Sequence, residues 1–452
     1  MTDVRLTRLS GGNSPFVAGT NFDLTTVGYV QAEYALSGRA CAYGRTPGGI
    51  AVTEEADFST RLLVFRPAED SAFNGTVWVE WLNVSGGLDA APSWVYSHTE
   101  AIRRGAAWVG VSAQRIGVMG GTSVLGMSGL ALVEIDPARY GELSHPGDRF
   151  SYDIYAQASS AVRLTTGTIL EGLAVERVLA IGESQSAFRL TTYVNDIDPI
   201  APVHDGFLVH ARGGNSAPLH DDGDPTHSAP SEPVKFRSDL RVPVLCVQSE
   251  TDLMSLNYLA ARQEDDDSFV LWEIAGAAHA DVYTFVAGAI DTGSPPFDEL
   301  AVAWKPVRDC AGMHFDFPVN AGPQHYLLNA AVWHLDRWVR DGTRPPSSPR
   351  LVVRDGAFVV DDYGNVLGGA RTPHVDAPTA VLSGFGNGGN PVAFLAGSTT
   401  PFEHEKVRDL YGTRIGYLER FAAATDEAVA AGFVLTDDVA EINAIAEINS
   451  PL

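Results

Sequence analysis

The sequence predicts an α/β fold, in which a mostly parallel central sheet is flanked by helices, and three observations carry this prediction. From about residue 61 onward, apolar runs of strand length alternate with helical patterns, which favours crossover connections between parallel strands. One apolar run, residues 178–181, turns sharply into a helical pattern at Ser184. Two later apolar runs are followed closely by an acid and by a histidine.

The composition is that of a globular protein, and its charge narrows the possible partners. Of 452 residues, 45% are hydrophobic and 19% charged, so a large core can form. A net charge of −25 argues against a basic surface for nucleic acid or anionic lipid, because Lys and Arg neutralise phosphate. No apolar run is long enough to span a membrane, and residues 1–16 lack the apolar core of a signal peptide. We expect a cytoplasmic protein that binds neither nucleic acid nor membrane.

The elements before the turn follow in order. Residues 1–60 are rich in Gly and Thr, with short alternating patterns that indicate a few antiparallel edge strands. Strands are then expected at 61–66, 76–82 and 107–112, with a helix around 94–104. Residues 152–170 have helical apolar spacing with Ala at close-packing positions, and this helix leads into the strand before Ser184.

The turn at residues 182–186 reads Gly-Glu-Ser-Gln-Ser and joins that strand to the next helix. A serine in so tight a turn projects its hydroxyl at the carboxyl end of the strand, beside helix N-terminal amides. Ser184 is therefore the candidate nucleophile. Ser186 replaces the second glycine of the Gly-x-Ser-x-Gly pattern and puts a side chain where the turn packs most closely.

Two strand ends downstream offer partners for this serine. The strand at 242–249 is followed by Glu250 and Asp252, and the strand at 269–274 by His279. Serine, acid and histidine in this order, each at the carboxyl end of a strand, predict a catalytic triad. The choice of acid between Asp252 and Glu250 stays open. The longer side chain of Glu250 could reach His279 from one residue past the strand, and Asp252 would then cap the following helix. Among the other histidines, His325 begins the helix at 324–340 and is a competitor as the base.

The surface insertion and the Pro-rich break indicate how the chain is divided into parts. Residues 211–240 are poor in apolar residues and form a surface insertion; its His and Asp residues at 220–227 have no frame that fixes a metal, so we expect none. A Pro-rich break at 345–349 precedes short strands and amphipathic helices at 414–431 and 437–447. We expect an N-terminal strand extension (1–60), a core (61–340) with insertions at 211–240 and 281–324, and a C-terminal cap (341–452) packed on the core.

These motifs resemble the α/β-hydrolase superfamily, and more closely a little-characterised bacterial branch of serine esterases of about this length. The segments that carry the resemblance are 182–186 (GESQS), 248–252 (QSETD), 276–279 (GAAH), 143–154, 334–342 and 371–384. The resemblance implies the α/β-hydrolase fold and a carboxylic ester hydrolase without a cofactor. Residues 249–252 match the superfamily's Gly-x-x-Asp acid pattern with Ser for Gly, which favours Asp252.

The resemblance also implies an oxyanion hole. The backbone NH of Gln185 matches one of its positions, and the second NH is expected from the loop at 83–87, at Val84 or Ser85; the HGGG signature of lipase-like members is absent.

The residue types then predict acyl-enzyme chemistry on a small-molecule ester, with His279 as the base for Ser184. Two alternatives remain at this point. One is another reaction on the same fold, namely acyl transfer, lactone opening or C–C hydrolysis, which a triad alone does not separate from ester hydrolysis. The other is a catalytically silent binding protein, which the absence of a triad residue would favour; none is absent.

Overall fold

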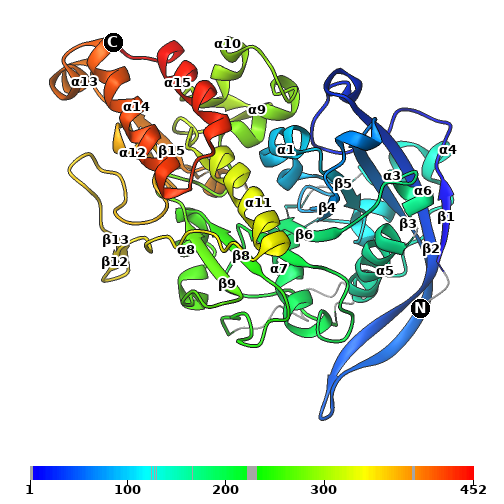
Figure 1. Cartoon of the computed structure of the whole chain (residues 1–452). Coiled ribbons are helices and arrows are strands. Elements are labelled where there is room, and N and C mark those ends of the chain that lie inside the picture. The colour runs from blue at the N-terminus through cyan, green and yellow to red at the C-terminus, as the bar shows by residue number, and fades with distance from the viewer. Residues whose placement is uncertain are drawn as a thin grey trace.

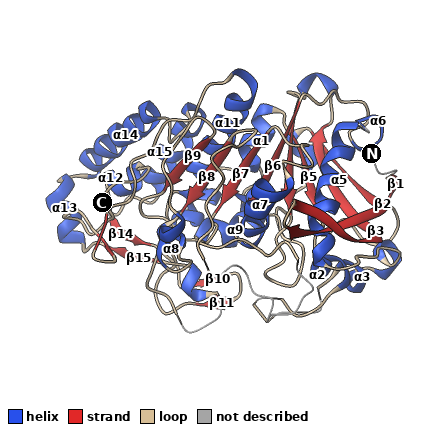
Figure 2. Cartoon of the chain, turned by 90° about the horizontal axis from the view of Figure 1, so that it is seen from below, coloured by secondary structure: helices blue, strands red, loops and turns tan. Residues whose placement is uncertain are grey.

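A computed structural model describes residues 4–123, 125–126, 128, 130–164, 166–220, 232–388 and 392–452. Part of the expected insertion at 211–240, including most of its His and Asp residues, lies outside the described residues. Figures 1 and 2 show a large sheet with helices on both faces. The described residues form nine strands of this sheet, in the order β1-β2-β3-β5-β4-β6-β7-β8-β9. They are β1 (Arg5–Arg8), β2 (Tyr29–Thr46), β3 (Gly49–Pro67), β4 (Thr76–Trp81), β5 (Ala107–Val111), β6 (Arg177–Glu183), β7 (Gly206–His210), β8 (Val244–Gln248) and β9 (Phe269–Glu273).

The six strands from β5 to β9 in this order are parallel, whereas β1, β2 and β3 pair antiparallel and β3 joins β5 antiparallel. The predicted fold class, a mostly parallel sheet of the α/β type, is confirmed. The antiparallel part of the sheet is larger than the few edge strands expected within residues 1–60. The hairpin of β2 and β3 stays paired from residue 29 to residue 67, so β3 runs straight through position 60.

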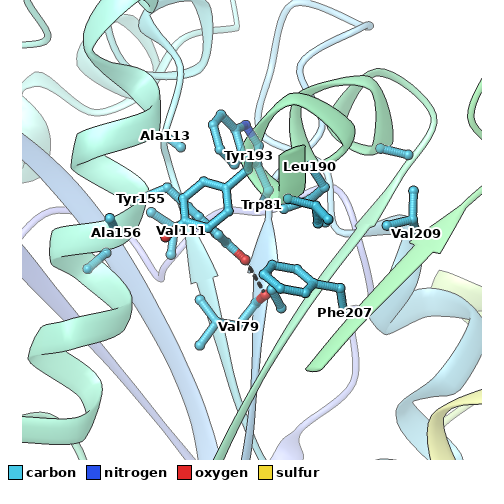
Figure 3. Close-up of a cluster of buried hydrophobic side chains, with 14 of the residues drawn as sticks. Val79, Trp81, Val111, Ala113, Tyr155, Ala156, Leu190, Tyr193, Phe207 and Val209 are labelled. Carbon is cyan, nitrogen blue, oxygen red and sulfur yellow. Dashed lines mark hydrogen bonds between the residues drawn. The ribbon is translucent and has the colours of Figure 1, made fainter. Parts of the chain in front are cut away.

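Burial on both faces explains why the parallel strands read as continuous apolar runs. Alternate residues of β4 point to opposite sides: Val79 and Trp81 enter one apolar cluster, and Trp78 enters the other. On the first face, α5 (Ser151–Leu164) and α7 (Gln185–Thr192) pack on the sheet. Figure 3 shows this cluster, in which the buried Tyr155 hydroxyl of α5 donates to the Val79 carbonyl at 2.8 Å.

The second face is covered by α1 (Pro92–Arg104), α9 (Val282–Ile290) and α11 (Gln324–Asp341). The helices α14 (Arg414–Ala431) and α15 (Val439–Ile448) add apolar side chains, including Tyr417 and Phe421, to the same cluster. Their apolar faces are therefore buried against the core, which agrees with the amphipathic pattern of the C-terminal segment.

Shorter elements connect these layers. They are α2 (Arg115–Met119), α3 (Leu132–Ile135), α4 (Pro137–Tyr140), α6 (Thr166–Ile169), α8 (Glu250–Met254), α10 (Phe297–Leu300), α12 (Pro373–Asp376), α13 (His404–Tyr411) and the strands β10 (Asp309–Cys310), β11 (Met313–His314), β12 (Val353–Arg354), β13 (Ala357–Phe358), β14 (Ala380–Ser383) and β15 (Ser398–Pro401). Part of the C-terminal segment lies beside the ends of β8 and β9: Ala275 N donates to Ala370 O at 3.2 Å, and Ala280 N donates to Leu395 O at 3.0 Å.

Candidate active site

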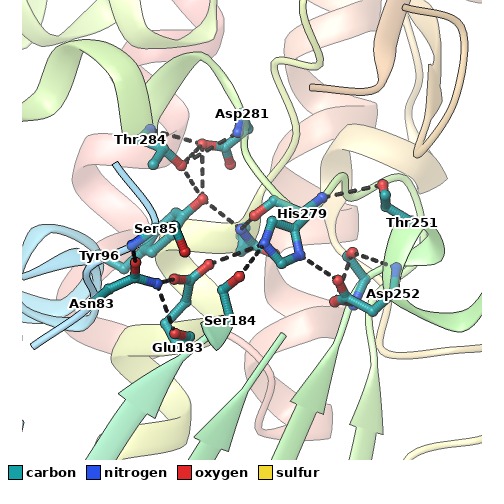
Figure 4. Close-up of polar contacts among 12 residues, drawn as sticks. Asn83, Ser85, Tyr96, Glu183, Ser184, Thr251, Asp252, His279, Asp281 and Thr284 are labelled. Carbon is teal, nitrogen blue, oxygen red and sulfur yellow. Dashed lines mark hydrogen bonds and ion pairs between the residues drawn. The ribbon is translucent and has the colours of Figure 1, made fainter. Parts of the chain in front are cut away.

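The carboxyl ends of parallel strands β4, β6, β8 and β9 bring polar side chains to one edge of the sheet (Figure 4). Asn83 follows β4, Ser184 follows β6, Asp252 lies in α8 directly after β8, and His279 follows β9. These four residues are far apart in the sequence. The parallel register places them together because parallel strands end at the same side of a sheet.

The backbone at Ser184 has the conformation that the turn motif requires. Its φ is 56° and its ψ is −119°, a combination that a non-glycine residue adopts only at a cost in strain. Its amide donates to the His210 carbonyl of β7 at 3.0 Å, which anchors the turn. At position 182 a Cβ atom would lie 2.9 Å from Leu190 Cδ1 and 3.2 Å from Ser186 Cβ. A side chain at 182 would press against Leu190 and Ser186, which favours glycine there. Ser186 itself is fully buried in the first turn of α7.

A chain of short polar contacts runs from the serine to a carboxylate. Ser184 Oγ lies 2.9 Å from His279 Nε2, and His279 Nδ1 lies 2.6 Å from Asp252 Oδ1. His279 is 4% exposed and Asp252 is fully buried, while Ser184 is partly exposed. Burial lowers the pKa of His279, but the Asp252 and Glu183 carboxylates outweigh it and hold that pKa above its usual value.

The two candidate acids have different partners. Asp252 uses Oδ1 for His279, and its Oδ2 accepts from Ser249 N at 2.7 Å and from Ser249 Oγ at 2.8 Å. It therefore faces the histidine and caps α8 at the same time. Glu250 points elsewhere: its carboxylate accepts from Gly276 N at 2.7 Å and from Gly384 N at 2.9 Å. The structure brings Asp252 to His279 and leaves Glu250 tying the C-terminal segment to the core.

The competing histidine at the start of α11 does not face the serine. His325 Nδ1 lies 2.7 Å from Tyr96 O, and its Nε2 lies 3.4 Å from Asn329 Nδ2. The ring stacks on Tyr283 with centroids 4.2 Å apart. Both nitrogens of His325 are therefore occupied within the second apolar layer.

The backbone NH groups predicted for the oxyanion hole differ in whether they already have an acceptor within the protein. Gln185 is the first residue of α7, where backbone NH groups have no intrahelical acceptor. Asn83 Nδ2 donates to Glu183 O at 3.1 Å, so the loop at 83–87 lies against the turn. The Ser85 NH, however, donates to Asn83 Oδ1 at 2.8 Å. An NH already engaged in this way is a poor oxyanion donor, which leaves Val84 as the candidate from this loop.

Glu183 is a further site residue to which the sequence pattern gave no role. Its Oε1 lies 3.5 Å from His279 Nε2, and its Oε2 accepts from Asn83 Nδ2 at 3.3 Å. Burial raises the pKa of Glu183 to about 7, although nearby His279 acts in the opposite direction. The signal was present in the sequence as an acid inside an otherwise apolar strand end, but its contact with the base depends on the folded geometry.

Among the residues that the structure describes, no group of three or more His, Cys, Asp or Glu side chains is placed to hold a metal ion. None of the helices formed by those residues combines the length and apolarity that crossing a membrane requires.

The chain was compared with protein families, curated sequences and solved structures, and the first comparison found a match. The model of the family described as "Alpha/beta hydrolase domain" matches residues 5–444. No curated protein sequence matches the chain. Similar solved structures include one from a study of two fungal esterases from Rhizomucor miehei (10% identity, TM-score 0.30, covering 57% of this chain and 77% of that one). Others are esterase Est22 (14%, 0.31, 57% and 76%) and an S-formylglutathione hydrolase from Agrobacterium tumefaciens (12%, 0.27, 53% and 86%). TM-scores this low carry no inference, so the family match stands alone.

Proposed function

This chain belongs to the alpha/beta hydrolase family, and from that premise we propose that it hydrolyses small-molecule carboxylic esters through an acyl-enzyme on Ser184. The observation that carries the proposal is the contact chain from Ser184 Oγ through His279 to Asp252, with separations of 2.9 Å and 2.6 Å. Nucleophile and base within hydrogen-bond reach, with a third group orienting the base, form the arrangement that activates a serine hydroxyl.

Acylation follows from these positions. His279 Nε2 takes the Ser184 proton as Oγ attacks the ester carbonyl, and the resulting imidazolium then gives that proton to the leaving alkoxide. Asp252 holds the proton of Nδ1, so that Nε2 is the nitrogen free to accept. Its buried carboxylate also stabilises the imidazolium.

The negative charge that forms on the substrate oxygen needs donors. The NH groups of Gln185 and Val84 are the donors we assign, each worth on the order of 3–4 kcal/mol of transition-state stabilisation. Asn83 sets the place of the second donor, because it binds both the turn and the Ser85 NH. Water then attacks the acyl-enzyme by the same route, with His279 as the base, and releases the carboxylic acid.

The test combines labelling and turnover. A fluorophosphonate should modify the purified protein once, and p-nitrophenyl esters of increasing acyl length should be hydrolysed. The Ser184→Ala variant should keep its fold, measured by circular dichroism, and lose both properties. Undiminished ester hydrolysis by that variant would falsify the assignment. Product analysis with added alcohols separates hydrolysis from acyl transfer.

A further inference from the structure

The imidazole of His279 has carboxylates at both of its nitrogens. Asp252 Oδ1 lies 2.6 Å from Nδ1, and Glu183 Oε1 lies 3.5 Å from Nε2, the nitrogen that faces Ser184 Oγ. The usual account of a serine, histidine and acid assigns only the first of these carboxylates. Glu183 directly precedes the nucleophile in the chain, so the strained turn that presents Ser184 also directs this second carboxylate toward the base.

The Glu183 side chain is held in this place. It is only 7% exposed, and Asn83 Nδ2 donates both to its Oε2 at 3.3 Å and to its backbone carbonyl at 3.1 Å. In the described part of the chain, His279 is the one basic group with which it forms an ion pair. A carboxylate so desolvated interacts strongly with whatever charge appears on that imidazole.

We propose that Glu183 is a second carboxylate partner of His279, which acts through the imidazole to stabilise its protonated form and to set the lower pH limit of the reaction. The role rests on the proposed function, since it concerns the base of that reaction. Glu183 does not take a proton from substrate. When Nε2 has received the Ser184 proton, this N–H lies between the leaving oxygen and Glu183, and the carboxylate lowers the energy of the cation until the proton passes on.

The other ionisable groups around the imidazole do not supply the same charge. Burial lowers the pKa of His210, at the end of β7, to about 4, so this histidine is neutral at physiological pH. Burial raises the pKa of Tyr96, in α1, well above its usual value, so it is neutral as well. Asp281 has a pKa raised to about 6 by burial and serves as the N-cap of α9, where it accepts from Thr284 N at 2.8 Å. Among the residues that the structure describes, Asp252 and Glu183 are thus the two carboxylates in ion-pair contact with the ring.

The sign of the effect follows from the charge. Burial raises the pKa of Glu183 to about 7, but a positive charge on His279 lowers it again, so the carboxylate is favoured when the imidazolium forms. Burial lowers the pKa of His279, and the Asp252 carboxylate and then the Glu183 carboxylate raise it. Loss of the negative charge makes the imidazolium easier to deprotonate, so the base stays active at lower pH. The same loss removes stabilisation of the imidazolium in the transition state, so the maximal rate falls.

The test is the pH dependence of kcat/KM for Glu183→Gln, which keeps an oxygen to accept from Asn83. The acid limb should move to lower pH by about one unit or more, as expected for removal of a charge within ~4–6 Å. The plateau should fall by about tenfold, the rate equivalent of one pKa unit. Glu250→Gln is the matched control: it removes another buried carboxylate near a strand end, but this one does not touch His279, so the acid limb stays in place.

A second measurement does not depend on turnover. In the Ser184→Ala background, the His279 ring is titrated by NMR with and without Glu183→Gln, and the midpoint should be lower in the double variant. Glu183→Asp, which keeps the charge, should recover part of the shift in both experiments. An unchanged acid limb together with an unchanged midpoint overturns the proposal. If the wild type hydrolyses no ester, the proposed function fails, while the NMR titration still decides the role of Glu183.

Discussion

Replacing Asp252 by Asn should separate its contact with the base from its contact with α8. Two donors, Ser249 N at 2.7 Å and Ser249 Oγ at 2.8 Å, face the Oδ2 position. The amide oxygen of Asn is therefore favoured there, because the opposite orientation would bring an NH₂ group against two donors. The NH₂ group then faces His279 Nδ1, which must accept. The ring proton moves to Nε2, the nitrogen that is needed to take the proton of Ser184.

The expected loss is large in rate and small in stability. A histidine held in the wrong tautomer costs about 10⁴-fold in kcat. The cap of α8 keeps its acceptor, so the free energy of unfolding should change by less than about 1 kcal/mol, the usual worth of such a cap.

Glu250→Gln should show the reverse pattern. One of its two acceptor oxygens becomes an NH₂ group facing the NH of Gly276 or Gly384. An unsatisfied buried pair of this kind costs about 1–3 kcal/mol of stability, and kcat should stay near the wild-type value.

The assay measures kcat with a p-nitrophenyl ester and unfolding by denaturant for both variants under the same conditions. A nearly normal kcat for Asp252→Asn, combined with a collapse for Glu250→Gln, would refute the assignment of Asp252 as the acid.

In single-turnover acylation, His279→Ala should abolish acylation, whereas His325→Ala should lower stability but still acylate, because its ring nitrogens face Tyr96 and Asn329; the opposite result would make His325 the base. A chain ending at Arg344 should aggregate or unfold, since the apolar side chains that the C-terminal segment adds to the second cluster are then lost and that cluster is exposed; a stable monomer with unchanged kinetics on bulky esters would contradict the cap. Burial raises the pKa of Glu250 from 4.5 to about 7, so the folded state binds this proton more tightly than the unfolded state. The free energy of unfolding should therefore fall as the pH rises from 4.5 through 7. Relative to Glu250→Gln, the fall should be about 3 kcal/mol. Unfolding curves for the two proteins across that range check the sign, and a constant difference would be inconsistent with it.

The ends of the parallel strands could be predicted from the sequence. Apolar runs with distinct ends located β6, β8 and β9, and the residues just past those ends are the ones that meet: Ser184, Asp252 and His279. This worked because parallel strands end at one edge of the sheet, so the position along the strand is enough to predict proximity.

Other features depend on side-chain direction, which periodicity does not give. Asp252 and Glu250 lie two residues apart, and the capping geometry of α8 decides which of them faces His279. The Ser85 NH is engaged by Asn83, a local turn that composition does not reveal. The approach of Glu183 to the base depends on the fold around the turn. The length of the hairpin of β2 and β3 was also beyond sequence reasoning, since its outer part alternates only weakly.

The proposed function depends on an acyl group carried on Ser184. Rapid quenching of the wild type with p-nitrophenyl acetate, followed by peptide mass mapping, tests it directly. A single acetyl group is expected on the peptide that contains Ser184, formed with the burst of p-nitrophenol and absent in Ser184→Ala. An acetyl group mapped to another residue, or steady hydrolysis by Ser184→Ala without an adduct, would contradict it.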